Sequence, residues 1–301
     1  MLKILRNLRE GGTSLELAIT PKEAIFQTVI VGVDFSPYSK LVVRQAEILA
    51  IEFHAKLILA YAIVEPWQLE HPEAYSSVTT PPLDREILEA EKKIQSFYKP
   101  KQNAKIFIAK ASPPSVLSFV VDSNPGSLIV IGSRGLGAVS RFLLGANAEQ
   151  IALTSSCPVW VHRGPKIVRF DRILIPIDLS QNAQRVIHLI KTWTAIKELR
   201  QKFLFVSPEA PETVDPMEFR MSSEKLSHAV HHSLREFKDS RGEVPLISDE
   251  GDPAERICHF GENFDVIAVN PHNRSGFFGT FGKVTTKVIR TSHVPVLVLK
   301  P

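Results

Sequence analysis

The chain has 301 residues, of which 44% are hydrophobic and 23% charged, and its formal net charge is +4. This length predicts two globular domains of about 150 residues, each able to bury a full core. The mild charge, without a run of Lys and Arg, argues against nucleic-acid binding. No apolar run reaches the roughly eighteen residues of a membrane span. Cys157 and Cys258 lack CxxC spacing, which is typical of buried thiols in a reducing cytoplasm, the location we expect.

Residues 1–24 begin with a short basic amphipathic stretch, MLKILRNLREGG. It lacks the uninterrupted apolar core of a signal peptide. We expect an N-terminal extension that packs on the body of the protein, and a membrane-surface or partner helix is the alternative.

The rest of the chain repeats itself. TVIVGVDFSPYSKLVV, from Thr28, matches RILIPIDLSQNAQRVI, from Arg172, because each is an apolar run that ends in Asp-x-Ser before a helical pattern. Near the end of each half, SSCPVWVHR matches SHVPVLVLK. Such a repeat predicts two similar domains, residues 25–165 and 166–301, joined at RGPKIVRF.

Each half alternates short apolar strands with helical patterns. Nearly continuous apolar strands between helices are typical of a parallel sheet that is covered on both faces. We therefore predict an α/β fold with two similar domains, each an open five-stranded parallel sheet with helices on both faces. Two Pro-rich stretches, EPWQLEHPEAYSSVTTPP and SPEAPETVDPMEF, are predicted to be long loops after the second strand of each half.

Asp34 follows the first strand of the first half. Ligands of open parallel sheets bind beyond the carboxyl ends of the strands, and a carboxylate there can accept hydrogen bonds from ribose or a purine amine. The alternative is a structural role, in which Asp34 caps the following helix together with Ser36 and Pro37. The two roles are compatible.

A glycine-rich loop follows a later strand, SLIVIG, which ends at Gly132. The loop continues through Gly135 to Gly145, where the next helix begins. Glycines allow close approach of backbone N–H groups, and a helix N-terminus suits phosphate. The alternative is a loop whose glycines only relieve backbone strain. The Walker motif GxxxxGK[ST], the dinucleotide motif GxGxxG and the nucleophile elbow GxSxG are all absent.

This order of motifs, Asp-x-Ser, then G-x2-G-x9-G, then CPVWV, resembles the universal stress protein family. The doubled halves resemble its tandem members, and the likeness covers about Thr28 to Lys300. The resemblance implies a parallel α/β fold and, where the glycine motif is present, ATP binding. Carried over residue by residue, it implies a nucleotide site at Asp34, Ala62, Ile131, Gly132, Arg134, Gly135, Gly145, Ala146 and Asn147.

Ala146 departs from the family's pattern. The family usually has Ser or Thr there, whose hydroxyl reaches a phosphate. Loss of one neutral hydrogen bond costs about 1 kcal/mol, or roughly fivefold in affinity. We expect a weakened site because backbone donors remain.

The second half departs further. Asn270 and Asn273 stand at the first two glycine positions, Gly282 at the third, and Lys283 at the Ser or Thr position. Pro271 removes one N–H donor. We expect a scaffold half that has a degenerate site and binds no ATP, and contact of Lys283 with a phosphate is the alternative.

The three histidines of HAVHHSL, at positions 228, 231 and 232, share one helical face. They have no identifiable acidic or cysteine partner, so we predict a solvated face and no metal site.

The resulting hypothesis is a tandem universal stress protein that binds ATP, with or without Mg²⁺, in its first half. It would act as a stress-response regulator on a protein partner that the sequence does not identify. Its halves would form an intramolecular pseudo-dimer through their terminal strands, with a homodimer of chains left open. Two alternatives are a nucleotide-free interaction protein of the same fold and a weak ATPase or phosphotransfer enzyme. No positioned general base or Walker-type magnesium site is visible, so catalysis would be slow at most.

Overall fold

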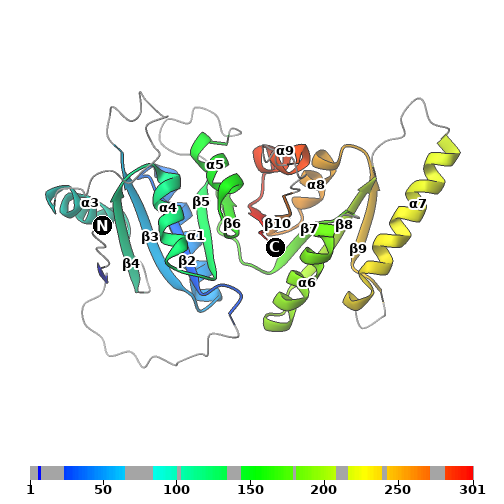
Figure 1. The fold of residues 1–301 in the computed structure, drawn as a ribbon, viewed down its shortest axis with the longest axis horizontal. Helices are drawn as coiled ribbons and strands as arrows, with labels where there is room; N and C mark the ends of the chain where they lie inside the picture. Colours follow the sequence, from blue (N-terminus) through cyan, green and yellow to red (C-terminus); the bar gives the residue numbers. More distant parts are fainter. Residues whose placement is uncertain are drawn as a thin grey trace. The chain divides into compact units, whose positions relative to one another are not determined.

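The computed structural model describes residues 6–7, 24–64, 84–99, 103–133, 144–178, 181–207, 216–238, 243–271 and 282–300. The chain divides into two compact units, Met1–Ile167 and Val168–Pro301 (Figure 1). The first predicted Pro-rich loop, residues 65–82, and most of the second lie outside the described residues.

The first unit alternates strands with helices along the chain. Its strands are β1 (Arg6–Asn7), β2 (Thr28–Val33), β3 (Lys56–Ile63), β4 (Ala104–Lys110), β5 (Ser127–Gly132) and β6 (Val159–His162). Its helices are α1 (Pro37–Glu52), α3 (Asp84–Phe97), α4 (Pro113–Asp122) and α5 (Ala146–Thr154). The strands lie in the order β4-β3-β2-β5-β6, all parallel, and β1 pairs antiparallel with the outer edge of β4.

The second unit repeats this arrangement. Its strands are β7 (Arg172–Pro176), β8 (Arg200–Ser207), β9 (Leu246–Glu250), β10 (Val266–Val269) and β11 (Val296–Val298). Its helices are α6 (Gln181–Ile196), α7 (Pro216–Ser233), α8 (Pro253–Gly261) and α9 (Lys283–Thr291), with a short 3₁₀ turn, η2 (Arg235–Phe237). The parallel order is β9-β8-β7-β10-β11. The predicted fold class is confirmed, and β1 is an addition that the sequence pattern did not predict.

Helices cover both faces of the first sheet. Helices α4 and α5 contact each other on one face, and α1 packs against β2, β3 and β5 (Figure 1). Right-handed crossovers place α1 and α3 on the face opposite α4 and α5. Val29, Ile30 and Val31 are therefore buried consecutively, which explains a run of apolar residues without alternation.

The strand order reverses at one place in each unit. In the first unit the chain passes from β2 to β3 on one side and later returns to the other side of β2 as β5. In the second unit it passes from β7 to β8 on one side and later returns to the other side of β7 as β10. Loops that leave two such strands diverge to opposite faces, so a crevice opens at their carboxyl ends. This topology sets where a ligand site is expected in each unit.

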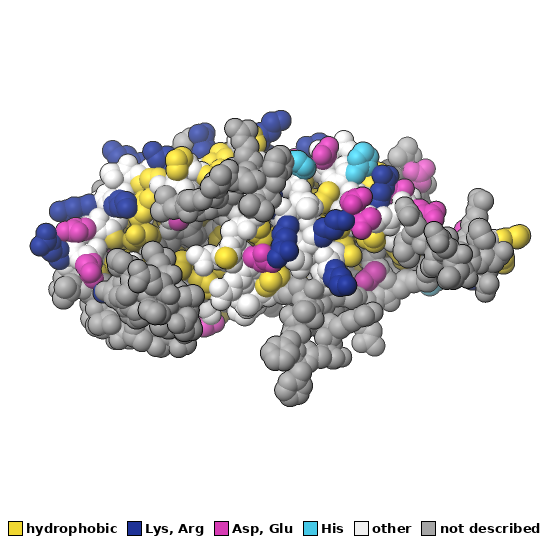
Figure 2. Space-filling model, turned by 90° about the horizontal axis from the view of Figure 1, so that it is seen from above, with side chains coloured by type: hydrophobic (Ala, Val, Ile, Leu, Met, Phe, Trp, Pro, Cys, Tyr) yellow, Lys and Arg dark blue, Asp and Glu magenta, His cyan; other side chains and the backbone are white. Residues whose placement is uncertain are grey.

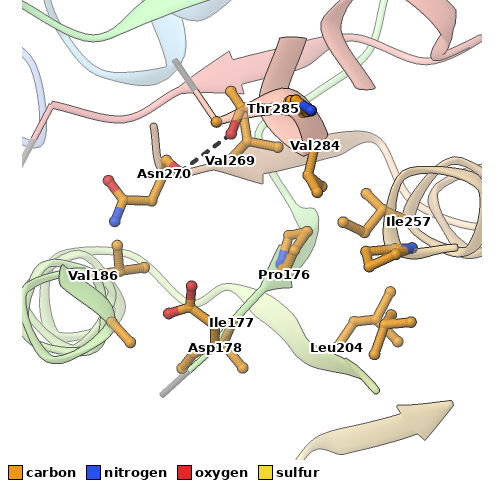
Figure 3. Close-up of a pocket in the computed structure, with 15 residues that line it drawn as sticks. Pro176, Ile177, Asp178, Val186, Leu204, Ile257, Val269, Asn270, Val284 and Thr285 are labelled. Carbon is orange, nitrogen blue, oxygen red and sulfur yellow. Dashed lines mark hydrogen bonds between the residues drawn. The ribbon is translucent and has the colours of Figure 1, made fainter. Parts of the chain in front are cut away.

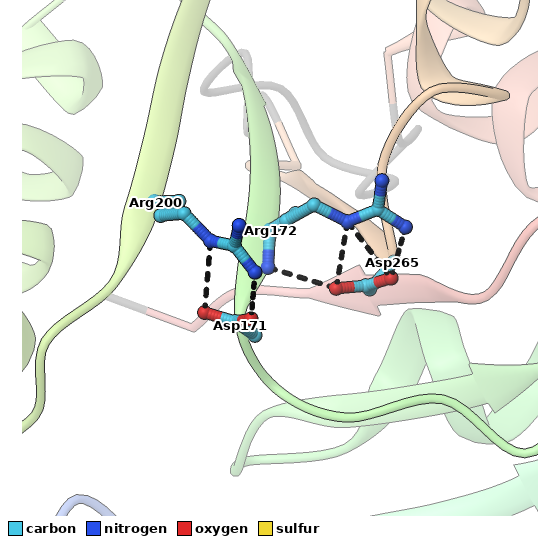
Figure 4. Close-up of polar contacts among 4 residues, drawn as sticks. All are labelled: Asp171, Arg172, Arg200 and Asp265. Atoms are coloured by element: carbon cyan, nitrogen blue, oxygen red, sulfur yellow. Dashed lines mark hydrogen bonds and ion pairs between the residues drawn. The ribbon is translucent and has the colours of Figure 1, made fainter.

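The opposite edge of the second sheet, at the amino ends of its strands, is held by ion pairs (Figure 4). Arg172 Nη2 lies 2.7 Å from Asp265 Oδ1, and the Arg172 amide donates to Asp265 Oδ2 at 2.9 Å. Arg200 pairs with Asp171, and this contact lowers the pKa of the Asp171 carboxyl. These contacts join β7, β8 and the start of β10 away from the crevice.

On the face shown in Figure 2, the described Lys and Arg side chains are interspersed with acidic ones and do not gather into one patch. None of the described helices combines the length and the apolar character that crossing a membrane requires.

Candidate functional site

The carboxyl edge of the first sheet brings together three segments that are distant in sequence. Val33 pairs with Tyr61 on β3, and Val31 pairs with Val130 on β5. Since parallel strands keep their register, Asp34 comes level with Ala62 on one side and with Ser133 on the other. The segments that follow β2 and β5 therefore meet at the strand-order reversal, and Ala62 on β3 lies on the other side of Asp34.

Asp34 forms a turn and does not cap the helix. Its Oδ1 accepts a hydrogen bond from the Ser36 amide at 3.0 Å, and its own amide donates to Ser39 Oγ at 3.3 Å. The cap of α1 is Ser36, whose Oγ accepts from the Ser39 amide at 3.1 Å. The structural alternative is therefore confirmed for Ser36 and Pro37, whereas Asp34 supports the cap residue and is not itself the cap. Its second carboxylate oxygen makes no hydrogen bond with any described residue and can still accept one.

Phe35 holds this turn in an unusual backbone conformation. Its φ is 59°, a left-handed value that is rare for a bulky residue. Its ring makes edge contacts with Tyr61 and Phe97, at centroid distances of 4.7 and 5.3 Å, and Lys93 Nζ lies 4.2 Å from the ring centre. These contacts offset the cost of the backbone conformation, which is about 1–3 kcal/mol. Phe35 therefore positions Asp34, a role that no sequence pattern indicated.

Ser133 links the end of β5 to the start of α5. Its amide donates to the His162 carbonyl at 3.1 Å, and its own carbonyl accepts from the Gly145 amide at 2.9 Å. The side chain is buried. The sequence analysis did not single out Ser133, although its place between Gly132 and Arg134 was the available signal. Arg134 and Gly135 lie outside the described residues.

Gly145 precedes α5 in a conformation that does not require glycine. Its φ is −68° and its ψ 145°, both open to any residue. Beyond its chain neighbours, a Cβ added there would meet one described atom within 4 Å, the Ser133 carbonyl oxygen at 3.8 Å. Among the described glycines, positive φ occurs at Gly126, Gly164 and Gly251. Relief of backbone strain therefore does not explain Gly145.

The first turn of α5 has no side-chain cap. By contrast, the caps of α1, α4 and α8 are Ser36, Ser112 and Asp252, and each accepts from the amide three residues on. Ala146 and Asn147 lie exposed in the first turn of α5. Uncapped amides at a helix N-terminus are the groups that bind phosphate in proteins.

Ala62 and Ile131, two further predicted site residues, differ in which of their atoms could contact a ligand. Ala62 is half-buried on β3, near the edge. The Ile131 side chain is buried in the sheet, next to Gly32. Ile131 can therefore contribute to a site only through its backbone. No group of three or more His, Cys, Asp or Glu side chains arranged for a metal ion occurs in the described part of the chain.

The corresponding edge of the second unit has a different chemistry. Asp178 follows β7, Asn270 follows β10, and Gly282 precedes α9, again without a side-chain cap. These residues line a cavity of about 280 Å³ (Figure 3). Asn273 and the three Phe residues of the loop lie outside the described residues.

Two doubly wound parallel sheets, one in each unit, define a tandem α/β protein, a class in which ligands generally bind beyond the strand ends where the strand order reverses. The universal stress protein family matches residues 25–163 and 169–300. The chain therefore belongs to the universal stress protein family, as a tandem member with two such domains.

Individual relatives agree with this assignment. A universal stress protein of Mycolicibacterium smegmatis is 22% identical over 291 residues, which cover 91% of this chain and 97% of the relative. One from Mycobacterium tuberculosis is 24% identical over 195 residues, and the match spans 62% of this chain but only 65% of that relative's length. The solved structure of a universal stress protein from Pseudomonas aeruginosa shares the fold, with a TM-score of 0.66, 14% identity, and coverage of 94% of this chain and 95% of its own.

Proposed function

We propose that this tandem universal stress protein binds one adenine nucleotide, ATP with or without Mg²⁺, at the carboxyl edge of its first unit. Gly145 is the observation that carries the proposal. Its backbone does not need glycine, and its Cβ position opens next to uncapped amides of α5. A glycine at such a place fits a backbone that closely approaches a bound phosphate.

The polar groups at this edge suit the parts of a nucleotide. The amides of Ala146 and Asn147 would hold phosphate, and Gly132 would supply the facing backbone, with Ser133 fixing the position of Gly145. The available oxygen of Asp34 would accept from the ribose or the base. Arg134 and Gly135 complete the proposed set on family resemblance alone. The described residues therefore fit ATP, and the bound nucleotide would supply a charge that the first turn of α5 stabilises.

We infer a regulatory role for the nucleotide. The site contains no positioned general base among its described residues, so occupancy fits a signal to a protein partner better than rapid turnover does. The same proposal includes a role in the stress response, a cytoplasmic location and the domain limits 25–165 and 166–301. It also includes the intramolecular pseudo-dimer and leaves a homodimer of chains open. Slow hydrolysis and a nucleotide-free interaction protein are its competitors.

Isothermal titration with ATP, with and without Mg²⁺, tests the proposal. We expect saturable binding by the wild type and an affinity at least about tenfold lower for Gly145→Ala, a difference of about 1.4 kcal/mol. Gln150→Ala is the matched control because this exposed residue lies one turn further along the same helix. It should bind as the wild type does.

Two results would decide against the proposal. If the wild type fails to bind ATP at millimolar concentration, the nucleotide-free interaction protein is favoured. If Gly145→Ala binds ATP as tightly as the wild type, the phosphate does not lie against α5. Hydrolysis that persists undiminished in a variant that has lost ATP binding would come from another site or a contaminant.

A further inference from the structure

Helix α7, which packs against β8 in the second unit, carries three histidines near its C-terminal end (Figure 1). His228, His231 and His232 lie in its last two turns, and all three side chains are exposed. Val230, between them, is 1% exposed and marks the face of the helix that is buried. The histidines therefore lie on one continuous helix and are accessible to ions in solution.

Their spacing sets two of these side chains beside each other. A helix turns about 100° per residue, so His228 and His232 each point about 160° away from Val230. His231 points about 100° away from Val230, toward the flank of the helix. Side chains four residues apart are neighbours on one face, with about 5–6 Å between their Cβ atoms. Two histidines with this spacing can hold one metal ion between them, as in the zinc-binding motif HExxH.

Both side chains are available as ligands. Neither His228 nor His232 forms a side-chain hydrogen bond or ion pair with any residue that the structure describes. The neutral imidazole is the commonest metal ligand in proteins, and it binds through one ring nitrogen. Since no contact with a described residue has to be broken, binding an ion here costs mainly the ordering of two exposed side chains.

The donor set indicates which ions fit. No third His, Cys, Asp or Glu joins the pair in a metal-binding arrangement within the described part of the chain. The lack of an acidic or cysteine partner led us to predict no metal site, but water can take that place. Structural Zn²⁺ sites are closed by four protein ligands. Cu²⁺ and Ni²⁺ accept nitrogen and oxygen ligands together in tetragonal geometry, so two imidazoles with water suit these ions better.

We propose that the exposed face of α7 binds a divalent copper or nickel ion through His228 and His232, with water in the other positions. The pair is open to solvent, so the ion exchanges readily. Neither histidine belongs to the nucleotide site proposed for the first unit, and this proposal does not depend on that one.

Isothermal titration of Ni²⁺ into the full chain, prepared without a polyhistidine tag, tests the site. Ni²⁺ is the probe because free thiols, such as the half-buried Cys258, reduce Cu²⁺. We expect saturable binding by the wild type. His228→Ala and His232→Ala should each lower the affinity by about tenfold or more, because the second ligand of a chelating pair binds intramolecularly.

His188→Ala is the matched control. This exposed histidine lies on α6, and no histidine stands three or four residues from it. The variant should bind Ni²⁺ as the wild type does. His231→Ala should also stay close to the wild type, because His231 points to the flank of α7.

A relocated histidine separates the effect of spacing from a loss of fold. Glu224→His in the His232→Ala chain places a histidine four residues before His228, at an exposed position of α7. It should recover most of the wild-type affinity, and thermal melts verify that each variant folds. The proposal is overturned if Ni²⁺ binding does not saturate, or if His228→Ala or His232→Ala binds it unchanged. It is also overturned if His188→Ala weakens binding as much, or if Glu224→His does not restore it.

Discussion

The two units have the same strand order but have diverged where it reverses. At this edge the first unit has an available oxygen of Asp34 and the uncapped N-terminus of α5, where Gly145 adds no side chain. The second unit keeps the aspartate, as Asp178, and the uncapped helix, but these residues border a cavity with mainly aliphatic walls. The fold therefore sets where a ligand site is expected in each unit, whereas a few residues beyond the strand ends determine the chemistry of that place.

The two units also differ at the ends of their last strands, where His162, the last residue of β6, corresponds to Leu299, which follows β11, and each is 0% exposed. Burial lowers the pKa of His162 to about 4, from about 6.5 in an unfolded chain. The unfolded state therefore binds more protons, and stability falls as pH decreases from about 6.5 to 4. This linkage amounts to about 3 kcal/mol. We expect His162→Leu, which copies the second unit, to remove it.

Urea unfolding of the wild type and His162→Leu at pH 7.5 and pH 4.5 measures the effect. The free energy of unfolding should fall further for the wild type than for the variant between these two values. An equal fall in both proteins would show that His162 is not buried in its neutral form. Leu299→Ala in the second unit provides a comparison, because it opens a cavity without adding a titrating group.

Gly261 and Gly145 differ in why a glycine is needed: Gly261 is required by packing, whereas Gly145 is proposed to make room for a ligand. Gly261 ends α8, and a Cβ there would lie 2.3 Å from Ile267 Cδ1 on β10, so Gly261→Ala forces the core apart. We expect a loss of about 1–3 kcal/mol. Gly145→Ala meets no such contact, and its stability should stay within about 0.5 kcal/mol of the wild type. Thermal denaturation of both variants checks the contrast, and a similar loss in Gly145→Ala would mean that its glycine is structural.

Ala146 allows a smaller test of the nucleotide site proposed for the first unit. Ala146→Ser restores the hydroxyl that the family pattern usually has, and it adds about one hydrogen bond, or roughly fivefold in ATP affinity. Titration of the variant beside Ser155→Ala, which alters a hydroxyl at the other end of α5, measures the gain. No gain in Ala146→Ser would imply that the phosphates do not reach the first turn.

Much of this architecture is predictable because strands and helices leave periodic patterns in the sequence. Asp-x-Ser and the glycine spacing also predicted that Asp34 and Gly145 belong to one site. The roles of Phe35 and Ser133 were not predictable, because one depends on contacts with Tyr61 and Phe97 and the other on a backbone bond to Gly145. The cavity of the second unit was missed for a similar reason. Its aliphatic lining has the same composition as a core, and only the packing reveals that the space is open.

The smallest expected effect on the free energy of unfolding comes from an ion pair at the amino edge of the second sheet. Thr28 in the first unit corresponds to Arg172 in the second, where the guanidinium pairs with Asp265. The Arg172 side chain is half exposed, so solvent screens the pair and its net contribution is about 1 kcal/mol or less. We expect Arg172→Thr to lower the free energy of unfolding by no more than that, with a difference that shrinks in 1 M NaCl. Urea titrations at low and high salt check this. A larger loss that salt does not reduce would show that the pair anchors β7 to β10, and that the two sheets are stabilised differently at their amino edges.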